Sequence, residues 1–237
     1  MGFFDFVDSL PAYEDRPVAV PRLNRRHDAI IGAHAADIVG ARVLDLGAHD
    51  GRWSYAFAGA DARAVVGIEG RADVAARLDH WPDPALRTKV NLRVDDVFDG
   101  IEKAIAAGER YDVVAVLGLF YHIMDHLRLL RLIRALGPRL VIVDSEFALR
   151  PNPVILLKSE WTDRPLNAPP QIAGQTKAVV GIPSFAAMAM MAEAMDFSLQ
   201  WWDWVNLPVN QRAGVSDYYR PQGQGKRRAT CALRPRA

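Results

Sequence analysis

The sequence predicts a doubly wound α/β fold, because short apolar runs alternate with helix-like stretches from about residue 22 to residue 147. The apolar runs are nearly continuous, which is typical of parallel strands that are covered by helices on both faces. The chain has 237 residues, of which 50% are hydrophobic and 24% are charged, so it is long enough for one sizeable core. We therefore expect a single domain over residues 1–237, built on a mostly parallel sheet.

Five apolar runs are the expected parallel strands. They are Arg42–Leu46, Ala64–Glu69, Val90–Val94, Val113–Leu117 and Leu140–Val143. Helical patterns separate them, and the last of these ends at a glycine followed by a proline: Asp73–Leu78, Gly100–Ala107 and Asp125–Leu136. Another helix is expected over Arg22–Val39, ahead of the sheet.

The pattern changes after residue 147. Residues 148–183 form an insertion rich in proline and polar turns, and long insertions in compact domains are often functional. A helix capped by Ser184 is expected to run through Met195, followed by strands at Phe197–Val205 and Arg228–Leu233. Residues 206–225 form a long loop between these two strands.

Composition excludes several classes of protein. The formal net charge of +1 provides no global basic field for nucleic acid. Cys231 is the only cysteine, which excludes an internal disulfide and a cysteine-based zinc cluster. No secretory signal is visible, and the longest apolar tract is interrupted by Pro183, Ser184 and Glu193. We expect a cytoplasmic protein that does not act on a membrane.

A short polar loop follows the first strand, in the stretch VLDLGAHDG at residues 43–51. Ligands of doubly wound sheets bind at the carboxyl ends of the strands. A dinucleotide fingerprint would require glycines at positions 47, 49 and 52, where this chain has Gly47, His49 and Arg52. An NAD-dependent oxidoreductase is therefore disfavoured.

The loop and its neighbours resemble the class I S-adenosylmethionine (SAM)-dependent methyltransferases. In that family the first strand ends in Asp-x-Gly-x-Gly-x-Gly, and the corresponding residues here are Asp45, Gly47, His49 and Gly51. The resemblance implies a Rossmann-like seven-stranded sheet of order 3-2-1-4-5-7-6. It also implies that SAM is the cofactor and that the last strand is antiparallel.

The same resemblance implies roles for residues at the next strand ends. Glu69 would bind the ribose diol, and Asp96, or its neighbour Asp95, would bind the adenine amino group. The backbone of Val97 would face the adenine ring, and Gly70 and Leu117 complete the expected cofactor site.

Two alternative roles stay open for each of two residues in the loop. His49 either turns outward without a chemical role, or it binds the carboxylate of the cofactor or lines the acceptor pocket. Asp45 either contacts the cofactor's amino group through water or satisfies the backbone of the turn.

The fourth strand leads into LFYH, which places Phe120, Tyr121 and His122 at the rim of the site. An alcohol acceptor must lose a proton, and His122 titrates near neutral pH, so we expect it to be the general base, with Tyr121 beside it. The alternative is that His122 is a packed rim residue. His126, one helical turn later, is expected to be a surface or capping residue.

The fifth strand ends in VIVDSEF, so Asp144 and Glu146 point toward the same rim. With a further carboxylate or His122 they could hold a Mg²⁺ ion, which prefers oxygen ligands. Alternatively, one of them orients His122 or binds an acceptor hydroxyl.

The acceptor pocket is expected to come from residues 13–26, the insertion and the loop at 206–225. The candidates combine polar and aromatic groups, which suits a sugar or glycoside hydroxyl: Glu160, Trp161, Gln175, Lys177, Asp217 and Tyr218. Trp201 is expected in the core, together with the methionines at 188, 190, 191 and 195, whereas Trp202 and Trp204 could cover a helix or a partner. A homodimer is compatible with the sequence.

Two other functions stay open. LFYH is similar to the strand end of enzymes that modify the tRNA wobble uridine, and the basic clusters are Arg22/Arg25/Arg26 and Lys226/Arg227/Arg228. Arg128, Arg131 and Arg134 are expected to form a solvated helix face. A non-catalytic SAM-binding protein is the other alternative.

Overall fold

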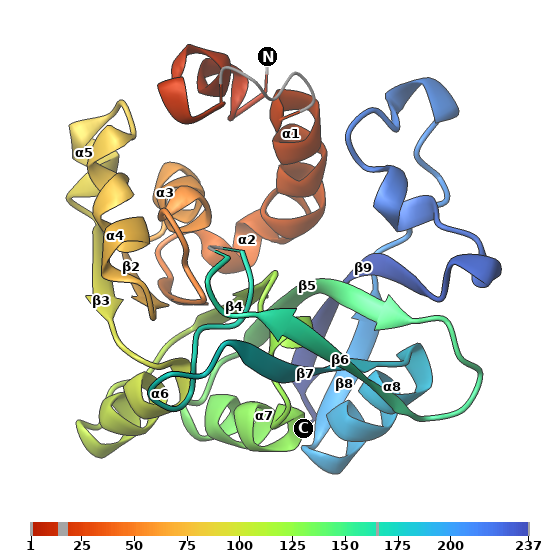
Figure 1. The fold of residues 1–237 in the computed structure, drawn as a ribbon. Helices are drawn as coiled ribbons and strands as arrows, with labels where there is room; N and C mark the ends of the chain where they lie inside the picture. Colours follow the sequence, from red (N-terminus) through yellow and green to blue (C-terminus); the bar gives the residue numbers. More distant parts are fainter. Residues whose placement is uncertain (1, 14–18, 165, 237) are drawn as a thin grey trace.

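The computed structural model describes residues 2–13, 19–164 and 166–236, and its centre is a seven-stranded sheet of order β3-β2-β1-β4-β5-β9-β8 (Figure 1). β9 runs antiparallel to β5, and β8 runs antiparallel to β9. The strands are β1 (Arg42–Leu46), β2 (Ala64–Glu69), β3 (Val90–Val94), β4 (Val113–Leu117), β5 (Leu140–Ala148), β8 (Phe197–Trp201) and β9 (Lys226–Pro235). Since β8 and β9 are the sixth and seventh strands of this sheet along the chain, the predicted order 3-2-1-4-5-7-6 is confirmed.

The first four strands have the predicted bounds, and the later ones differ. β5 extends to Ala148 because it pairs with β9 as far as Lys226. β8 ends at Trp201 instead of Val205, because the chain turns there and Trp204 packs on Tyr218 with ring centroids 4.0 Å apart.

Helices cover both faces of the sheet, as the continuous apolar strands predict. Alternate strand residues such as Leu44 and Val116 pack with α6 (Val97–Ala106), α7 (His126–Ala135) and α8 (Phe185–Ala194). Val43 and Ala115 face the opposite layer, which contains α1 (Ala19–Ile30) and α3 (Arg52–Gly59). Each buried aliphatic side chain of this kind contributes about 1.5–3 kcal/mol.

Several helices differ from the expected ranges. The helix predicted over residues 22–39 is divided by the 3-10 turn η3 (Gly32–His34) into α1 and α2 (Ala35–Ile38). α4 (Ala72–Ala75) continues into η4 (Ala76–His80), and α3 and α5 (Pro84–Arg87) were not expected. α8 begins after Ser184, whose hydroxyl accepts a hydrogen bond from the Ala187 amide, as predicted.

The insertion contains a hairpin that the sequence did not predict. β6 (Ile155–Trp161) and β7 (Lys177–Pro183) form a separate two-stranded antiparallel sheet. The Gly181 amide donates to the Ile123 carbonyl at 2.9 Å, so the hairpin is attached to the segment after β4. Its tip lies at the sheet edge near β4 and α6 (Figure 1).

The remaining segments contain only short turns. Near the amino terminus η1 (Asp5–Ser9) and η2 (Pro11–Tyr13) lie beside α3, with Phe4 buried between them and Trp53. The loop at 206–225 contains η6 (Val209–Gln211), η7 (Ser216–Tyr219) and η8 (Gln222–Gln224). Among the helices of the described ranges, none is long and apolar enough to cross a membrane.

Candidate active site

The loop after β1 has an unusual backbone that brings it close to any ligand at the sheet edge. Gly47, His49 and Gly51 all have positive φ angles, of 70°, 53° and 77°. A Cβ atom on Gly51 would lie 2.8 Å from Leu78 Cδ1, so the position requires glycine. His49 adopts this conformation at a cost of about 1–2 kcal/mol.

The His49 side chain bonds to its neighbours through one ring nitrogen only. Nδ1 lies 3.1 Å from Arg52 Nη2 and 3.4 Å from Asp50 Oδ1. Nδ1 therefore lies between a guanidinium that donates and a carboxylate that accepts, and its own role follows the tautomer of the ring. Nε2 is buried and has no hydrogen-bond partner in the part of the chain that the structure describes. It is the ring nitrogen of His49 that could bond to a ligand at this loop.

Asp50 fixes this loop, which the sequence reasoning missed. Its carboxylate accepts from Arg52 Nε and Nη2, both at 2.7 Å, and from the Tyr13 hydroxyl at 3.0 Å. Burial alone would raise the pKa of Asp50, but the Arg52 guanidinium and the His49 ring together outweigh it and hold this pKa well below its usual range. In the sequence, the oppositely charged residues on either side of Gly51 could have indicated this ion pair.

Asp45 lies under the loop and is fully buried. Its Oδ2 accepts a hydrogen bond of 2.7 Å from Ser54 Oγ, which ties β1 to α3. Burial raises the pKa of Asp45 to about 7, with a further contribution from the charge of Glu69, while the Ser54 bond opposes the shift. Asp45 therefore titrates near neutral pH.

Three more acidic residues lie at the carboxyl ends of β2 and β3. Glu69 accepts from the His49 amide and from the Arg71 amide, both at 2.9 Å. Asp95 pairs with Lys103 at 2.6 Å. Asp96 caps α6, whose first residue is Val97, by accepting from the Phe98 amide at 2.8 Å. These side chains gather at one end of the loop, as expected for a ligand site.

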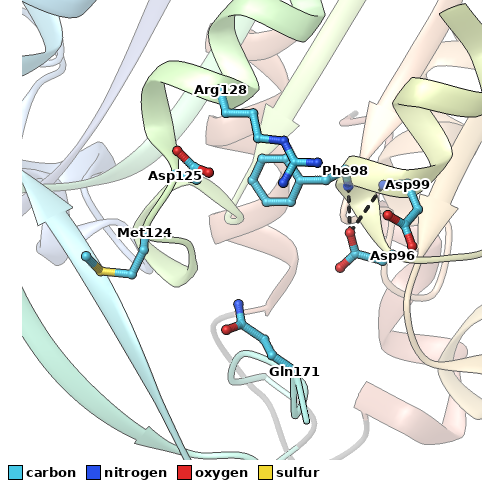
Figure 2. Close-up of a pocket in the computed structure, with 7 residues that line it drawn as sticks. All are labelled: Asp96, Phe98, Asp99, Met124, Asp125, Arg128 and Gln171. Atoms are coloured by element: carbon cyan, nitrogen blue, oxygen red, sulfur yellow. Dashed lines mark hydrogen bonds between the residues drawn. The ribbon is translucent and has the colours of Figure 1, made fainter.

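A pocket of about 410 Å³ opens beside Asp96 (Figure 2). Arg128 stacks over the Phe98 ring at 4.8 Å, and Gln171 of the insertion points into the pocket from the opposite side. Arg128 also pairs with Glu102 at 2.7 Å. It therefore lines the pocket in addition to forming a solvated helix face. The full lining is Asp96, Phe98, Asp99, Met124, Asp125, Arg128 and Gln171.

His122 lies in η5 (Phe120–His122), directly after β4, and pairs with a carboxylate from the hairpin. Its Nδ1 is 2.6 Å from Glu160 Oε2, and Glu160 Oε1 accepts from Lys158 Nζ at 2.9 Å. Burial raises the pKa of Glu160, but the bonds from His122 and Lys158 outweigh it and lower this pKa to about 2. The carboxylate is thus ionised and can only accept, so Nδ1 carries the proton of the neutral ring. Nε2 is left with a lone pair.

Tyr121 connects His122 to a second polar cluster. Its ring centroid is 4.0 Å from that of His122, and its hydroxyl accepts from Arg228 Nη2 at 3.0 Å. Leu117, at the end of β4, is buried beneath these residues.

Asp144 is the centre of that second cluster and is fully buried. Oδ1 accepts from Arg26 and Arg228, both at 2.8 Å, and Oδ2 accepts from Tyr218 at 2.6 Å and Thr230 at 2.7 Å. Burial raises its pKa, but the two arginines outweigh it and hold the pKa well below the usual range. A carboxylate has about four acceptor positions, and all of them are filled.

The Mg²⁺ hypothesis for Asp144 and Glu146 does not fit these partners. Glu146 faces two cations, since Arg220 Nη1 lies 3.0 Å from Oε1 and Lys226 Nζ bonds to Oε2. Asp144 has no acceptor position left for a metal ion, and both oxygens of Glu146 already bond to cations. Within residues 2–13, 19–164 and 166–236, no three His, Cys, Asp or Glu side chains are grouped to share a metal. Both residues stabilise the contact of β5 with β9 and the 206–225 loop.

The expected acceptor residues divide into two groups. Asp217 and Tyr218 lie near Asp144, where Asp217 pairs with Arg22 at 2.8 Å. Trp161 lies on the face of the hairpin opposite Glu160, with Lys177 over its ring at 4.4 Å. Gln175 accepts from the Gln171 amide at the hairpin tip. Of the expected segment 13–26, residues 14–18 lie outside the described ranges.

Other expectations are corrected by burial. His126 is not a surface residue: it is 1% exposed, and its Nε2 lies 2.9 Å from the Phe120 carbonyl oxygen. Trp201 is in the core, as predicted, packed against Phe147 and Phe185. Met188 and Met191 are buried and Met195 packs on the core, but Met190 is 58% exposed. Trp204 is buried against Tyr218, and Trp202 is partly exposed.

The fold, the strand order and the glycine-containing loop define a class I SAM-dependent methyltransferase. A family model described as a methyltransferase domain matches residues 20–208, and the chain belongs to this family. None of the curated proteins matches the chain.

Solved structures with the same fold include three informative neighbours. The N-terminal domain of EvdMO1, in the presence of S-adenosylhomocysteine (SAH) and D-fucose, is 18% identical with a TM-score of 0.63, covering 91% of this chain and 83% of that one. A SAM-dependent methyltransferase from Mesorhizobium loti is 16% identical with a TM-score of 0.59, covering 93% and 99%. A 1,6-didemethyltoxoflavin-N1-methyltransferase from Burkholderia thailandensis, bound to its substrate and SAH, is 18% identical with a TM-score of 0.53, covering 98% and 86%.

Proposed function

We propose that this methyltransferase methylates a hydroxyl oxygen of a small polar acceptor, with His122 as the general base. The observation that carries the proposal is the 2.6 Å contact between His122 Nδ1 and the ionised Glu160 carboxylate. This contact leaves the Nε2 lone pair available, which is the arrangement that a base requires.

SAM supplies an electrophilic methyl group when it is bound. His122 Nε2 would take the proton of the acceptor hydroxyl, so that its oxygen could accept the methyl group that SAM would supply. The resulting imidazolium is stabilised by Glu160, which accepts from Nδ1 throughout. Tyr121 supports the ring of His122 from the other side.

The residues of the loop after β1 fit the methionine end of SAM. Gly47 and Gly51 let the backbone approach the ligand, and the buried His49 Nε2–H would donate to the cofactor's carboxylate. Asp45, which titrates near neutral pH, lies below the place of the amino group.

The strand ends beyond this loop fit the rest of the cofactor. Glu69 and Gly70 would contact the ribose. Asp95 or Asp96, with Val97 and Leu117, would contact adenine.

A sugar or glycoside is the acceptor that we infer. EvdMO1, which has the same fold, was solved with D-fucose. We further infer that the insertion at 148–183 and the loop at 206–225 shape the acceptor pocket, because Glu160 comes from the insertion and Asp217 of the loop bonds to Arg228, which also bonds to Tyr121. The basic clusters of the tRNA alternative form ion pairs within the protein instead, since Arg22, Arg26 and Arg228 pair with Asp217 and Asp144. A small acceptor is therefore favoured over tRNA.

Two measurements test the proposal. Calorimetry should show binding of SAH but not NAD, and loss of SAH binding in Glu69→Ala. A screen of sugars, phenols and tRNA with methyl-radiolabelled SAM should identify a hydroxyl acceptor. With that acceptor, His122→Ala should retain SAH affinity and lose ~10²-fold or more in turnover. Unchanged turnover in His122→Ala would remove this residue from the reaction.

A further inference from the structure

Arg71 connects the cofactor end of the site to the hairpin that carries Glu160. Its guanidinium Nη2 lies within hydrogen-bond distance of three carbonyl oxygens of one loop: 2.9 Å from Thr162, 3.3 Å from Arg164 and 3.4 Å from Asn167. Three converging carbonyl dipoles form a cradle for a cation. This contact joins the residue after β2 to a segment more than ninety positions later in the sequence.

The backbone of the same residue contacts the proposed cofactor site. The Arg71 amide donates to Glu69 Oε1 at 2.9 Å, and Glu69 Oε2 accepts from the His49 amide. One residue thus bonds to the expected ribose-binding carboxylate through its main chain and to the hairpin through its side chain.

The loop that Arg71 holds is itself closed and is continuous with Glu160. Thr162 bonds to Thr176 through its amide and to Gln175 through its hydroxyl, at 3.1 and 2.6 Å. The Ala168 amide lies 3.4 Å from Glu160 Oε2, the oxygen that also faces His122. Movement of this loop would therefore change the surroundings of the His122–Glu160 pair directly.

Besides the Arg71 contact, bonds at the base of the hairpin hold it in place, such as those between Val154 and Ser184. Gly181 bonds to the Ile123 carbonyl, and β6 and β7 pair with each other as a two-stranded sheet. The outer face of the hairpin is exposed, with Leu157 at 67% and Val179 at 53%. A two-stranded sheet of this kind is only marginally stable without support.

We propose that Arg71 is a positioning residue, which holds the hairpin across the cofactor end of the site and thereby keeps Glu160 on His122. The inference rests on the proposed role of His122 as the base. It adds that the Nδ1–H form of His122 depends on a contact at the end of β2. Occupation of the site around Glu69 and orientation of the base are coupled through one residue.

The test is the ring tautomer of His122, measured from ¹⁵N chemical shifts at a pH where the ring is neutral. The chain has six histidines, and His122→Asn assigns the signal. In the wild type we expect the proton of the neutral ring on Nδ1 of His122. In Arg71→Ala we expect a mixture of His122 tautomers, faster amide exchange at Ala168, and turnover lower by ~10- to 100-fold.

Arg77→Ala is the matched control, because Arg77 lies one helical segment later and contacts only Asp73, at 3.9 Å, in the described ranges. It should leave the tautomer and turnover unchanged. If Arg71→Ala does not fold, Arg71→Lys tests the same point, since one ammonium reaches fewer carbonyls, and an intermediate tautomer mixture is expected.

A pure Nδ1–H tautomer with unchanged exchange in either Arg71 variant would overturn the inference. This failure is distinct from failure of the proposed function. Full turnover in His122→Ala would refute the base, whereas the tautomer of His122 reports on Arg71 without any acceptor.

Discussion

Two buried carboxylates, Asp144 of β5 and Glu160 of the hairpin, differ in the partners that they bond to. Asp144 is fully buried and its four acceptor positions are filled by two arginines, a tyrosine and a threonine. Glu160 is also buried, but it bonds to a histidine that has a second ring nitrogen to offer. The comparison shows that a carboxylate saturated by fixed donors stabilises the fold, while one that orients an unsaturated group can support chemistry.

The largest effect that tests this comparison is expected for Asp144→Asn. The substitution leaves Arg26 and Arg228 buried with less compensation for their charge, so the free energy of unfolding should fall by ~3–5 kcal/mol. Chemical denaturation measures this change. Asp37→Asn is the matched control on the surface, where the pair with Arg234 contributes ~0–1 kcal/mol. A loss below that of the control would contradict the structural role of Asp144.

Glu160→Ala is expected to lower turnover strongly, with a smaller loss of stability than Asp144→Asn. Without the carboxylate, nothing fixes the proton on His122 Nδ1, and turnover should fall by ~10²-fold while SAH affinity is kept. Steady-state kinetics and calorimetry provide the two readouts. Equal losses of stability in Glu160→Ala and Asp144→Asn would remove the distinction drawn above.

The pH dependence of stability sharpens the contrast with a third carboxylate, Asp45. Its folded pKa of about 7 lies above the ordinary value of 3.8, so the unfolded state binds fewer protons between these values and stability falls as pH rises through them. Asp45→Asn should therefore be more stable than the wild type by up to ~4 kcal/mol at pH 8, with no such gain at pH 3.5. Denaturation at the two pH values decides it, and a gain that is equal at both would exclude Asp45 as the cause.

The contribution of Glu160 to the free energy of unfolding should depend on pH with the opposite sign. Its folded pKa of about 2 lies below the ordinary value of 4.5, so its contribution is complete above pH 4.5 and is lost as pH falls toward 2. The difference in unfolding free energy between wild type and Glu160→Ala should shrink over this range. A difference that grows on acidification would contradict the ion pair.

The smallest effect is expected for Trp161→Ala, on the face of the hairpin opposite Glu160. Trp161 is 46% exposed, so stability should change by no more than ~0.5 kcal/mol and turnover should not change. A large loss of turnover would mean that this outer face, and not the face with Glu160, meets the acceptor.

The sequence predicted the parallel sheet well because its strands β1, β2, β4 and β5 are buried on both faces. Runs such as Val113–Leu117 are wholly apolar and lie between Asp112 and Gly118, so four strands were placed with their correct bounds. The hairpin was missed because β6 reverses the usual pattern. Leu157 is exposed while Glu160 is buried, which no hydropathy rule anticipates.

The site was predictable where one strand end carries the chemistry and not where distant segments meet. His122 and Glu160 were both candidates, but their pairing depends on the hairpin that brings them together from 38 residues apart. Asp144 was read as a catalytic or metal residue because its strand position is correct for either. Its partners Arg26 and Arg228 lie 118 and 84 residues away, so its saturation could not be inferred.

The most direct test of the central claim is transfer from ¹³C-methyl-labelled SAM to the acceptor, followed by NMR of the product. The account predicts a methyl carbon bonded to oxygen, formed by the wild type and ~10²-fold more slowly by His122→Ala at unchanged SAH affinity. A methyl carbon bonded to nitrogen, or equal rates in the two proteins, would contradict it.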